Sequence, residues 1–469
     1  MCQEMIRMIP EEFLFGASLS GFQFEMGGDR EIIDENTDWF RWVHDEMNIL
    51  TGVVSGDLPE DGPGYWRNFN AFHDLAEEAG MNSLRIGVEW SRIFPKPTFD
   101  VDGKSLRKVC DMNAVDHYRS IMSDIKQRGM KLMVNLNHFT LPIWCHDPVA
   151  VNRRLDLSCS GWLDKRTANE FSKYASFAAE CFDDLVDFWS TLNEPNIVAM
   201  LGYFSRESGF PPSIIAPDLW NSALENQVDA HRLAYREIKK ISAKPVGMLY
   251  ATVWLDGDSS KERAMDLLNW NPLDSFLSES DFLGINYYSR NVVETVPGIV
   301  GDSQCPVKWK MLDGYGYSCT PGSRSRSGNL STDNGWEFYP EGLYRMASEI
   351  SRRYSTPLLI TENGVADAHD IYRPRYLTSH FDVIERLLDE GVDLRGYLHW
   401  SLTDNYEWAL GMSMKFGLAG LDPVTGELVP RPSLYLYREI IRSRSVSRFL
   451  SQKQQKPGEG SMEVSDGYH

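Results

Sequence analysis

The stretch DFWSTLNEPN, residues 187–196, places a carboxyl group at the end of a buried strand. Its bulky apolar residues predict an extended, buried segment, and Pro195 ends that segment because proline cannot donate to a strand ladder. A carboxylate in such a position costs free energy unless it is paired, hydrogen-bonded or protonated. We therefore interpret Glu194 as a candidate functional residue.

Similar short apolar segments recur along the whole chain. Together with residues 187–194 they give eight strand candidates, the others being 13–20, 83–90, 131–139, 244–254, 281–288, 357–364 and 394–402. Amphipathic segments with apolar residues at helical spacing lie between most of them, for example 69–81, 114–130 and 378–391. Strand alternating with helix eight times predicts the α/β class and a single-domain (β/α)8 TIM barrel.

The composition of the chain bears on its domain organisation. No linker rich in Pro, Gly or Ser divides it, so we expect one barrel domain over residues 1–442. Long inserts after the first and sixth strands, the latter at about 290–340, would form loops on the active-site face. Residues 443–469 contain few apolar side chains, and we predict that they form a disordered tail.

The charge and the cysteines restrict the partners and the compartment. The formal net charge is −20, which argues against nucleic acid and anionic membranes and favours an uncharged substrate. The 7 cysteines show no metal-binding or paired spacing, which is typical of free thiols in a reducing compartment. We find no signal-like or membrane-spanning run, so we expect a cytoplasmic protein.

Polar or aromatic residues stand where the predicted strands end. In a (β/α)8 barrel these ends line the active site. The fifth strand has no comparable residue, but the other strand ends supply Gln23, Arg85, His138, Asn193, Glu194, Asn286, Tyr288, Glu362, Asn363 and Trp400.

Two carboxyl groups, Glu194 and Glu362, would point into the mouth of the same barrel. Such a pair suits glycosidic cleavage, in which one group protonates the leaving oxygen and the other attacks the anomeric carbon. At a separation of roughly 5 Å the second group is a nucleophile and configuration is retained. Burial and like charge would keep Glu194 protonated, while Arg85 and Tyr288 would keep Glu362 ionised.

The other strand ends suit a sugar, although each has a simpler interpretation. Trp400, Trp408 and Phe416 offer apolar faces to ring C–H groups, and the polar side chains offer partners to hydroxyls. Taken singly, however, a strand-end Glu is more often a salt bridge or helix cap, and Arg85 could be a structural ion-pair partner. His138 could equally be a core histidine, and the aromatic segment 399–408 could be core packing.

The sequence gives no sign of a metal site or a phosphate-binding loop. The 10 histidines are scattered, with no zinc-binding pair beside a Glu. The segment GYGYSC, residues 314–319, lacks the spacing of a phosphate-cradling loop. We expect neither a metal ion nor another cofactor.

These motifs together resemble family 1 of the glycoside hydrolases, the retaining β-glycosidases, and in particular its archaeal β-galactosidase/β-glucosidase branch. The resemblance runs from about Phe13 to about Ile441. TLNEPN at 191–196 is similar to the acid/base motif and ITENG at 360–364 to the nucleophile motif. Other matching stretches are FLFGASLSGFQFE, LRIGVEWSRIFP, GINYYSR, GWEFYPEGLY and LHWSLTDNYEW.

The resemblance implies a role for each residue of the site. Glu194 would be the acid/base and Glu362 the nucleophile of a retaining hydrolysis of terminal β-D-glucosyl and β-D-galactosyl residues. Arg85, Asn286 and Tyr288 would position the nucleophile. The residues that bind a small β-glycoside or disaccharide would be Gln23, His138, Asn193, Trp336, Trp400, Glu407, Trp408 and Phe416. Homo-oligomers, dimers or tetramers, are compatible with this branch.

Two features depart from the family pattern. Phe139 stands where relatives usually have Trp, which would change one wall of the pocket. The segment 255–280 looks shortened, and we expect less helix outside the barrel there.

Two alternatives to the hydrolysis of neutral β-glycosides stay open. A non-hydrolytic sugar-binding barrel predicts loss of a carboxylate, yet both carboxylates are present. Relatives that act as 6-phospho-β-glycosidases typically carry Ser, Lys and Tyr where this chain has Glu407, Met414 and Phe416.

Overall fold

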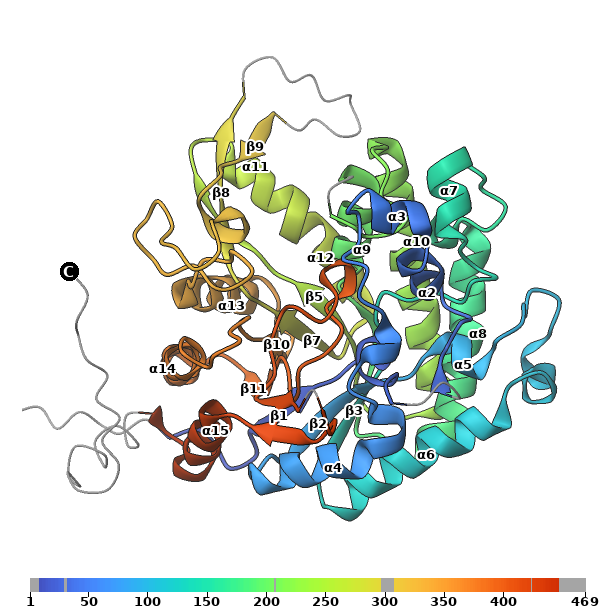
Figure 1. Ribbon diagram of the computed structural model, residues 1–469, viewed down its shortest axis with the longest axis horizontal. Coiled ribbons are helices and arrows are strands. Elements are labelled where there is room, and N and C mark those ends of the chain that lie inside the picture. Colours follow the sequence, from blue (N-terminus) through green and yellow to red (C-terminus); the bar gives the residue numbers. More distant parts are fainter. Residues whose placement is uncertain (1–7, 29–31, 206–207, 297–307, 423, 447–469) are drawn as a thin grey trace, which may run out of the picture.

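The computed structural model describes residues 8–28, 32–205, 208–296, 308–422 and 424–446. At its centre is a closed barrel of parallel strands in the order β1-β11-β10-β7-β5-β4-β3-β2 (Figure 1). This confirms the predicted (β/α)8 barrel. The barrel strands are β1 Leu14–Ser18, β2 Ser83–Gly87, β3 Lys131–Asn137, β4 Phe188–Asn193, β5 Val246–Ala251, β7 Phe282–Asn286, β10 Leu358–Asn363 and β11 Leu394–His399.

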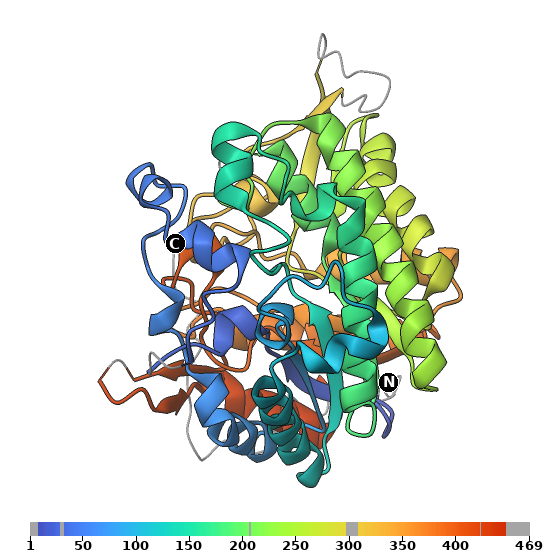
Figure 2. The ribbon, with the colours of Figure 1, turned by 90° about the vertical axis from the view of Figure 1, so that its right-hand side faces the viewer.

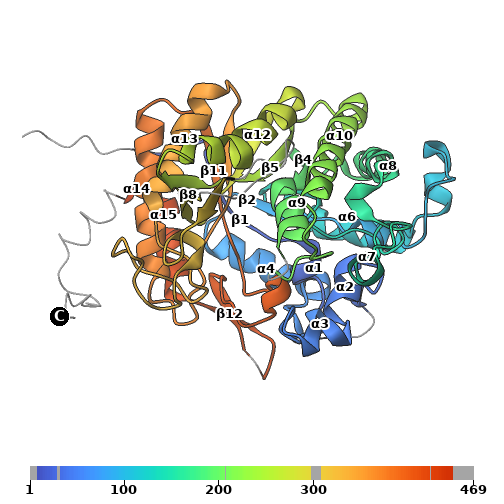
Figure 3. The ribbon, with the colours of Figure 1, turned by 90° about the horizontal axis from the view of Figure 1, so that it is seen from above.

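Amphipathic helices cover the outside of the barrel. Figure 3 shows α13, α14 and α15 on one side of the sheet and α6, α8 and α10 on the other. Their buried faces include alanines, such as Ala175 and Ala178 of α8 and Ala230 of α10, which allow two helices to pack closely. The outer helices are α4 Tyr65–Glu78, α6 Met112–Gln127, α8 Lys165–Phe182, α10 Pro217–Ile241, α13 Pro340–Arg353, α14 Arg373–Asp389 and α15 Pro432–Ser443.

Side chains fill the interior of the barrel, so it is a packed core and not a channel. One cluster joins residues of β3, β5, β7, β10 and β11, namely Met133, Leu249, Phe282, Leu359 and Leu398. Each is at most 3% exposed. The alternation of side chains along each strand sends these residues inward and their neighbours outward to the helices.

The inserts on the active-site face form structure of their own. The insert after β1 holds the short helices α1 Gly21–Phe24, α2 Asp38–Val43 and α3 Glu46–Leu50. The segment 244–254, predicted as one strand, instead gives β5 and then β6 Trp254–Gly257. The prediction was wrong there because β6 leaves the barrel and pairs with β8 Arg290–Thr295, which in turn pairs with β9 Trp309–Met311.

Shorter helices complete the connections between strands. After β2, β3 and β4 come α5 Trp90–Ile93, α7 Pro148–Arg154 and α9 Pro195–Phe204. The segment 255–280 still supplies helix, as α11 Lys261–Met265 and α12 Asn271–Phe276, and α12 contacts α10.

The loop over residues 400–418 carries several of the predicted site residues, and a buried ion pair holds it to the rest of the fold. Asp404 accepts a hydrogen bond from the Gly417 backbone N–H (3.0 Å) and forms a 2.8 Å ion pair with Arg431. Arg431 follows the hairpin of β12 Ala419–Leu421 and β13 Leu428–Pro430, which stands out at the lower left of Figure 2. This buried pair therefore ties the loop to the body of the fold.

The folded part of the chain extends past residue 442. Arg444 donates a side-chain hydrogen bond to the carbonyl of Ile9 (3.0 Å), and Val446 is 4% exposed. The expected boundary at 442 falls within α15, which ends at Ser443, and Val446 beyond it donates its backbone N–H to Glu385 of α14. Residues 447–469 of the predicted tail lie outside the described residues.

All cysteines within the described residues are free, as expected from their spacing. These are Cys110, Cys145, Cys159, Cys181 and Cys319.

Candidate active site

Glu194 and Glu362 both lie at the C-terminal end of the barrel. Glu194 directly follows β4 and is 8% exposed, and Glu362 is the fifth residue of β10 and is 3% exposed. The pairing between β10 and β7 shifts register between Ile360 and Glu362. Such an irregularity re-aims side chains, and here Thr361 and Glu362 both contact residues of the site.

Both oxygens of Glu362 receive strong hydrogen bonds. Arg85 donates from Nη1 to Oε1 (2.6 Å), and Tyr288 donates its hydroxyl to Oε2 (2.7 Å). Charge-assisted bonds of this length are strong and leave the carboxylate one fixed orientation. The charge of Glu362 and the burial of the phenol raise the pKa of Tyr288 well above its usual value, burial being the larger cause.

Arg85 links this carboxylate to the sugar-facing residues. Its other terminal nitrogen, Nη2, lies 2.9 Å from His138 Nδ1 and donates to Asn193 Oδ1 at 3.0 Å. Because the guanidinium can only donate, His138 Nδ1 accepts and its ring hydrogen sits on Nε2. Burial and the charge of Arg85 lower the pKa of His138 well below its usual value, so the imidazole is neutral.

Glu194 is held by its backbone and by one side-chain bond. Its φ of +47° is left-handed, a conformation that costs a non-glycine residue about 1–3 kcal/mol and is most often seen at functional sites. Its own N–H donates to the Leu249 carbonyl (2.8 Å), and Asn286 donates to its Oε1 (2.8 Å). Burial, followed by repulsion from Glu362, raises the pKa of Glu194 to about 8.

Aromatic rings form two walls beside these carboxyl groups. The ring of His138 is stacked between Trp400 (5.6 Å between centroids) and Trp408 (5.8 Å). On the other side Trp336 contacts Tyr288 (5.2 Å) and Phe416 (5.9 Å). The aromatic side chains predicted from the sequence therefore meet at one site.

Glu407 and Gln23 lie together next to the tryptophan wall. Gln23 donates from Nε2 to Glu407 Oε2 at 3.4 Å. Burial, with a smaller effect of the charge of Glu362, raises the pKa of Glu407 to about 8. The structure thus places the predicted carboxyl groups close to the predicted polar and aromatic side chains. Asn363 is an exception, because its amide donates to the Tyr287 carbonyl and the Tyr376 hydroxyl.

The loop that carries Trp336 is anchored by its neighbour Glu337. This buried carboxylate forms a 2.9 Å ion pair with Arg290 and accepts hydrogen bonds from Ser325 (2.6 Å) and the Gly316 N–H (2.9 Å). Burial alone would raise the pKa of Glu337, but these donors outweigh burial and lower it to about 2. The sequence analysis did not single out Glu337, although it lies inside the GWEFYPEGLY motif.

Thr361 is a second residue that the sequence analysis missed. Its hydroxyl donates to Asn286 Oδ1 (2.7 Å) and so turns the Asn286 amide hydrogens toward Glu194. Its position directly before Glu362 in ITENG was the available signal. In the same motif Gly364 allows a close approach, because a Cβ there would lie 1.7 Å from the carbonyl oxygen of Trp400.

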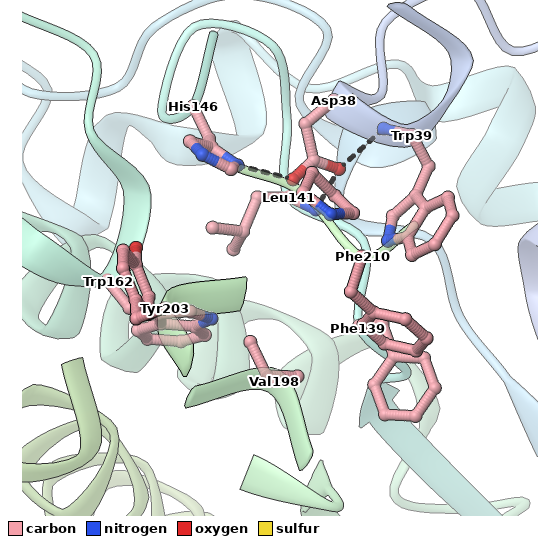
Figure 4. Close-up of a pocket in the computed structure, with 10 residues that line it drawn as sticks. Asp38, Trp39, Phe139, Leu141, His146, Trp162, Val198, Tyr203 and Phe210 are labelled. Atoms are coloured by element: carbon pink, nitrogen blue, oxygen red, sulfur yellow. Dashed lines mark hydrogen bonds and ion pairs between the residues drawn. The ribbon is translucent and has the colours of Figure 1, made fainter. Parts of the chain in front are cut away.

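Phe139, the departure noted in the sequence, closes one wall of the pocket with other aromatic rings. Its φ is +74°, and its ring contacts Trp408 (5.0 Å) and Phe210 (5.1 Å). Behind it lies a cavity that is also lined by Asp38 and His146, which are hydrogen-bonded to each other at 2.7 Å (Figure 4). Phe139 therefore both contacts the ring of Trp408 and lines this cavity.

The described residues contain neither a helix that could span a membrane nor a cluster of metal-binding side chains. None of their helices is long and apolar enough to cross a membrane. The same residues contain no group of three or more His, Cys, Asp or Glu side chains arranged to hold a metal ion.

The fold and this pair of carboxyl groups define a class of protein. A buried carboxylate held by Arg85 and Tyr288, near a second carboxyl group with a raised pKa at the mouth of a barrel, is the arrangement of a glycosidase.

The comparisons with known proteins identify the family. The chain matches the model of glycosyl hydrolase family 1 over residues 5–269 and 271–446. The β-galactosidase of Saccharolobus solfataricus is 42% identical over 93% of this chain and 96% of that protein. The chain belongs to glycosyl hydrolase family 1, and it is a β-glycosidase.

Solved structures agree with this assignment. The crystal structure of Fpglu1 from Fervidobacterium pennivoraus has a TM-score of 0.93 at 48% identity, with 95% of this chain and 98% of that chain covered. A β-glucosidase mutant derived from a hyperthermophilic tetrameric structure has a TM-score of 0.89 at 43% identity, with 95% and 98% covered.

Proposed function

We propose that this enzyme removes terminal β-D-glucosyl and β-D-galactosyl residues from neutral β-glycosides, with Glu362 as nucleophile and Glu194 as acid/base. The observation that carries the assignment is the asymmetry of the two carboxyl groups. Glu362 accepts hydrogen bonds from the guanidinium of Arg85 and the hydroxyl of Tyr288, whereas the pKa of Glu194 is raised to about 8. Glu194, whose side chain is hydrogen-bonded to the neutral amide of Asn286, starts protonated and can donate its proton.

The proposed reaction has two steps. Glu362 attacks the anomeric carbon while Glu194 protonates the leaving oxygen, which gives a covalent glycosyl-enzyme. Esterification removes the charge of Glu362, so the pKa of Glu194 falls. Glu194 then takes a proton from water, which hydrolyses the intermediate with net retention.

Neutral sugars suit the part of the site formed by Glu407 and Gln23 better than phosphorylated sugars do. The half-buried Glu407 next to Gln23 can accept hydrogen bonds from sugar hydroxyls. A phosphate dianion would meet this carboxyl group without a cation, since Met414 is uncharged and Phe416 has no hydroxyl. This pocket chemistry supports the neutral glycosidase over the 6-phospho alternative.

Replacement of each carboxyl group separates the two roles. Glu362→Gly should abolish turnover, and azide should restore cleavage of activated aryl glycosides with inverted product. Glu194→Ala should slow substrates with poor leaving groups most, because protonation matters least for a stable leaving group. If azide gave the inverted glycosyl azide with the 194 variant, the two roles would have to be exchanged.

We also propose that the enzyme is cytoplasmic and forms a homo-oligomer, a dimer or tetramer. The structural neighbour derived from a tetrameric structure supports the assembly. Light scattering after gel filtration would test it, and a mass of one chain would contradict it.

A further inference from the structure

Glu89 is a buried carboxyl group that takes no part in the proposed chemistry. It follows β2, precedes α5 and is 3% exposed. Its Oε1 accepts a hydrogen bond from the backbone N–H of Phe22 (2.8 Å), and its Oε2 accepts one from the hydroxyl of Thr140 (2.6 Å). These two partners are more than 100 positions apart in the sequence.

Each partner of Glu89 adjoins a proposed sugar-binding residue. Phe22 precedes Gln23 in the short helix α1. Thr140 follows His138 by two positions, and its backbone N–H donates to the His138 carbonyl (2.9 Å). One carboxyl group therefore connects the helix that carries Gln23 to the loop that carries His138.

The fit of α1 against Glu89 depends on the absence of a side chain at Gly21. A Cβ at Gly21 would lie 2.3 Å from Glu89 Oε1. The N-cap residue of α1, Ser20, makes no capping bond with its side chain, so Glu89 supplies the acceptor for the free N–H of Phe22. This contact fixes the position of a four-residue helix that could not be stable alone.

Within the described part of the chain, Glu89 has no cation among its hydrogen-bond partners. Its nearest charged neighbours include Glu25, whose ion-pair partner is Arg92. Burial, followed by the charge of Glu25, raises the pKa of Glu89 to about 8. A glutamine has the shape of the neutral carboxyl group and can reproduce both contacts, with its oxygen toward Phe22 and its nitrogen toward Thr140.

We propose that Glu89 is a positioning residue that holds Gln23 and His138 in register so that both bind one sugar ring. The inference rests on the proposed function, in which these two side chains bind the glycone. Loss of the connection should weaken binding of the sugar more than it slows the chemical step. The reason is that Glu362 keeps its bonds from Arg85 and Tyr288, and Glu194 keeps its bond from Asn286.

Steady-state kinetics of Glu89→Gln, Glu89→Leu and Thr140→Val on a p-nitrophenyl β-glucoside test the proposal. We expect KM to rise about tenfold or more in the Leu and Val variants, with kcat changed less than about threefold. The Gln variant should stay within about threefold of the wild type in both constants. If Glu89→Leu fails to fold, the Thr140→Val result decides.

Thr98→Val is the matched control for Thr140→Val. Thr98 is buried, and its hydroxyl donates to the buried Glu170 (2.6 Å) on the outside of the barrel. The Thr98→Val variant should have a lower melting temperature than the wild type, with an unchanged KM. An unchanged KM in Thr140→Val, or an equal rise in Thr98→Val, would overturn the positioning role while leaving the proposed function intact. A wild type without activity on neutral glycosides would overturn both.

Discussion

Replacement of Glu362 by Gln should lower the pKa of Glu194 without restoring its ordinary value. Burial is the larger cause of the raised pKa of Glu194, and repulsion from Glu362 is the second. Glutamine keeps the size of Glu362 but removes its charge. The variant therefore reproduces the change in charge that we propose for the glycosyl-enzyme.

The size of the effect follows from the two charges. Two unit charges roughly 5 Å apart, the spacing of retaining enzymes, interact by about 3 kcal/mol at an effective dielectric constant of about 20. The guanidinium of Arg85, which is 2.6 Å from Glu362, neutralises part of that charge. If half remains, about 1.5 kcal/mol is lost, and the titration of Glu194 moves down by about one pH unit. The burial of Glu194 is unchanged in the variant and keeps its pKa above the ordinary value of 4.5.

Carbon-13 NMR of protein labelled at the glutamate carboxyl carbon measures this titration directly. The resonance of Glu194 is the one missing from Glu194→Gln. As a control, Glu170→Gln removes a buried carboxyl group on the outside of the barrel and should leave the midpoint of Glu194 in place. A midpoint that moves by less than about 0.3 pH units in Glu362→Gln, or moves up, would refute the proposed cycling of the proton.

Three further predictions concern stability and specificity. Because the pKa of Glu194 is higher in the folded state, its ionisation opposes folding, and the free energy of unfolding falls as pH rises from about 4.5 to 8. Glu194→Gln should therefore raise the melting temperature more at pH 8 than at pH 5. Equal changes at the two pH values, measured by calorimetry, would contradict this. A chain ending at Val446 should melt like the full chain, whereas one ending at residue 442 loses the buried Val446 and should melt several degrees lower by circular dichroism. The kcat/KM for a β-glucoside and a β-galactoside should differ by about tenfold, and both should far exceed that for a 6-phosphoglucoside; comparable turnover of the phosphorylated substrate would contradict the role of Glu407.

The sequence alone was sufficient to predict the barrel and to propose most residues of the site, although it did not single out Glu337 or Thr361. Strand period, helix period and their alternation are local properties, so eight repeats define the architecture without knowledge of any contact. In a barrel all strand ends meet at one face, and residues as far apart as Arg85 and Glu362 could therefore be placed together. Local pattern misjudged the segment after β5 and the end of the fold, because leaving the barrel and burial of Val446 depend on distant partners.

Only the tertiary structure decided which hydrogen bonds these residues make with one another. The tautomer of His138 follows from Arg85, which lies 53 positions away. The N–H of Glu194, whose backbone is left-handed, is bound by the carbonyl of Leu249 on another strand. The joint support of Gln23 and His138 by Glu89 is likewise a contact between three separate segments. Hydrogen-bond partners and burial, which set each pKa, are properties of the packed chain, and no local stretch of sequence contains them.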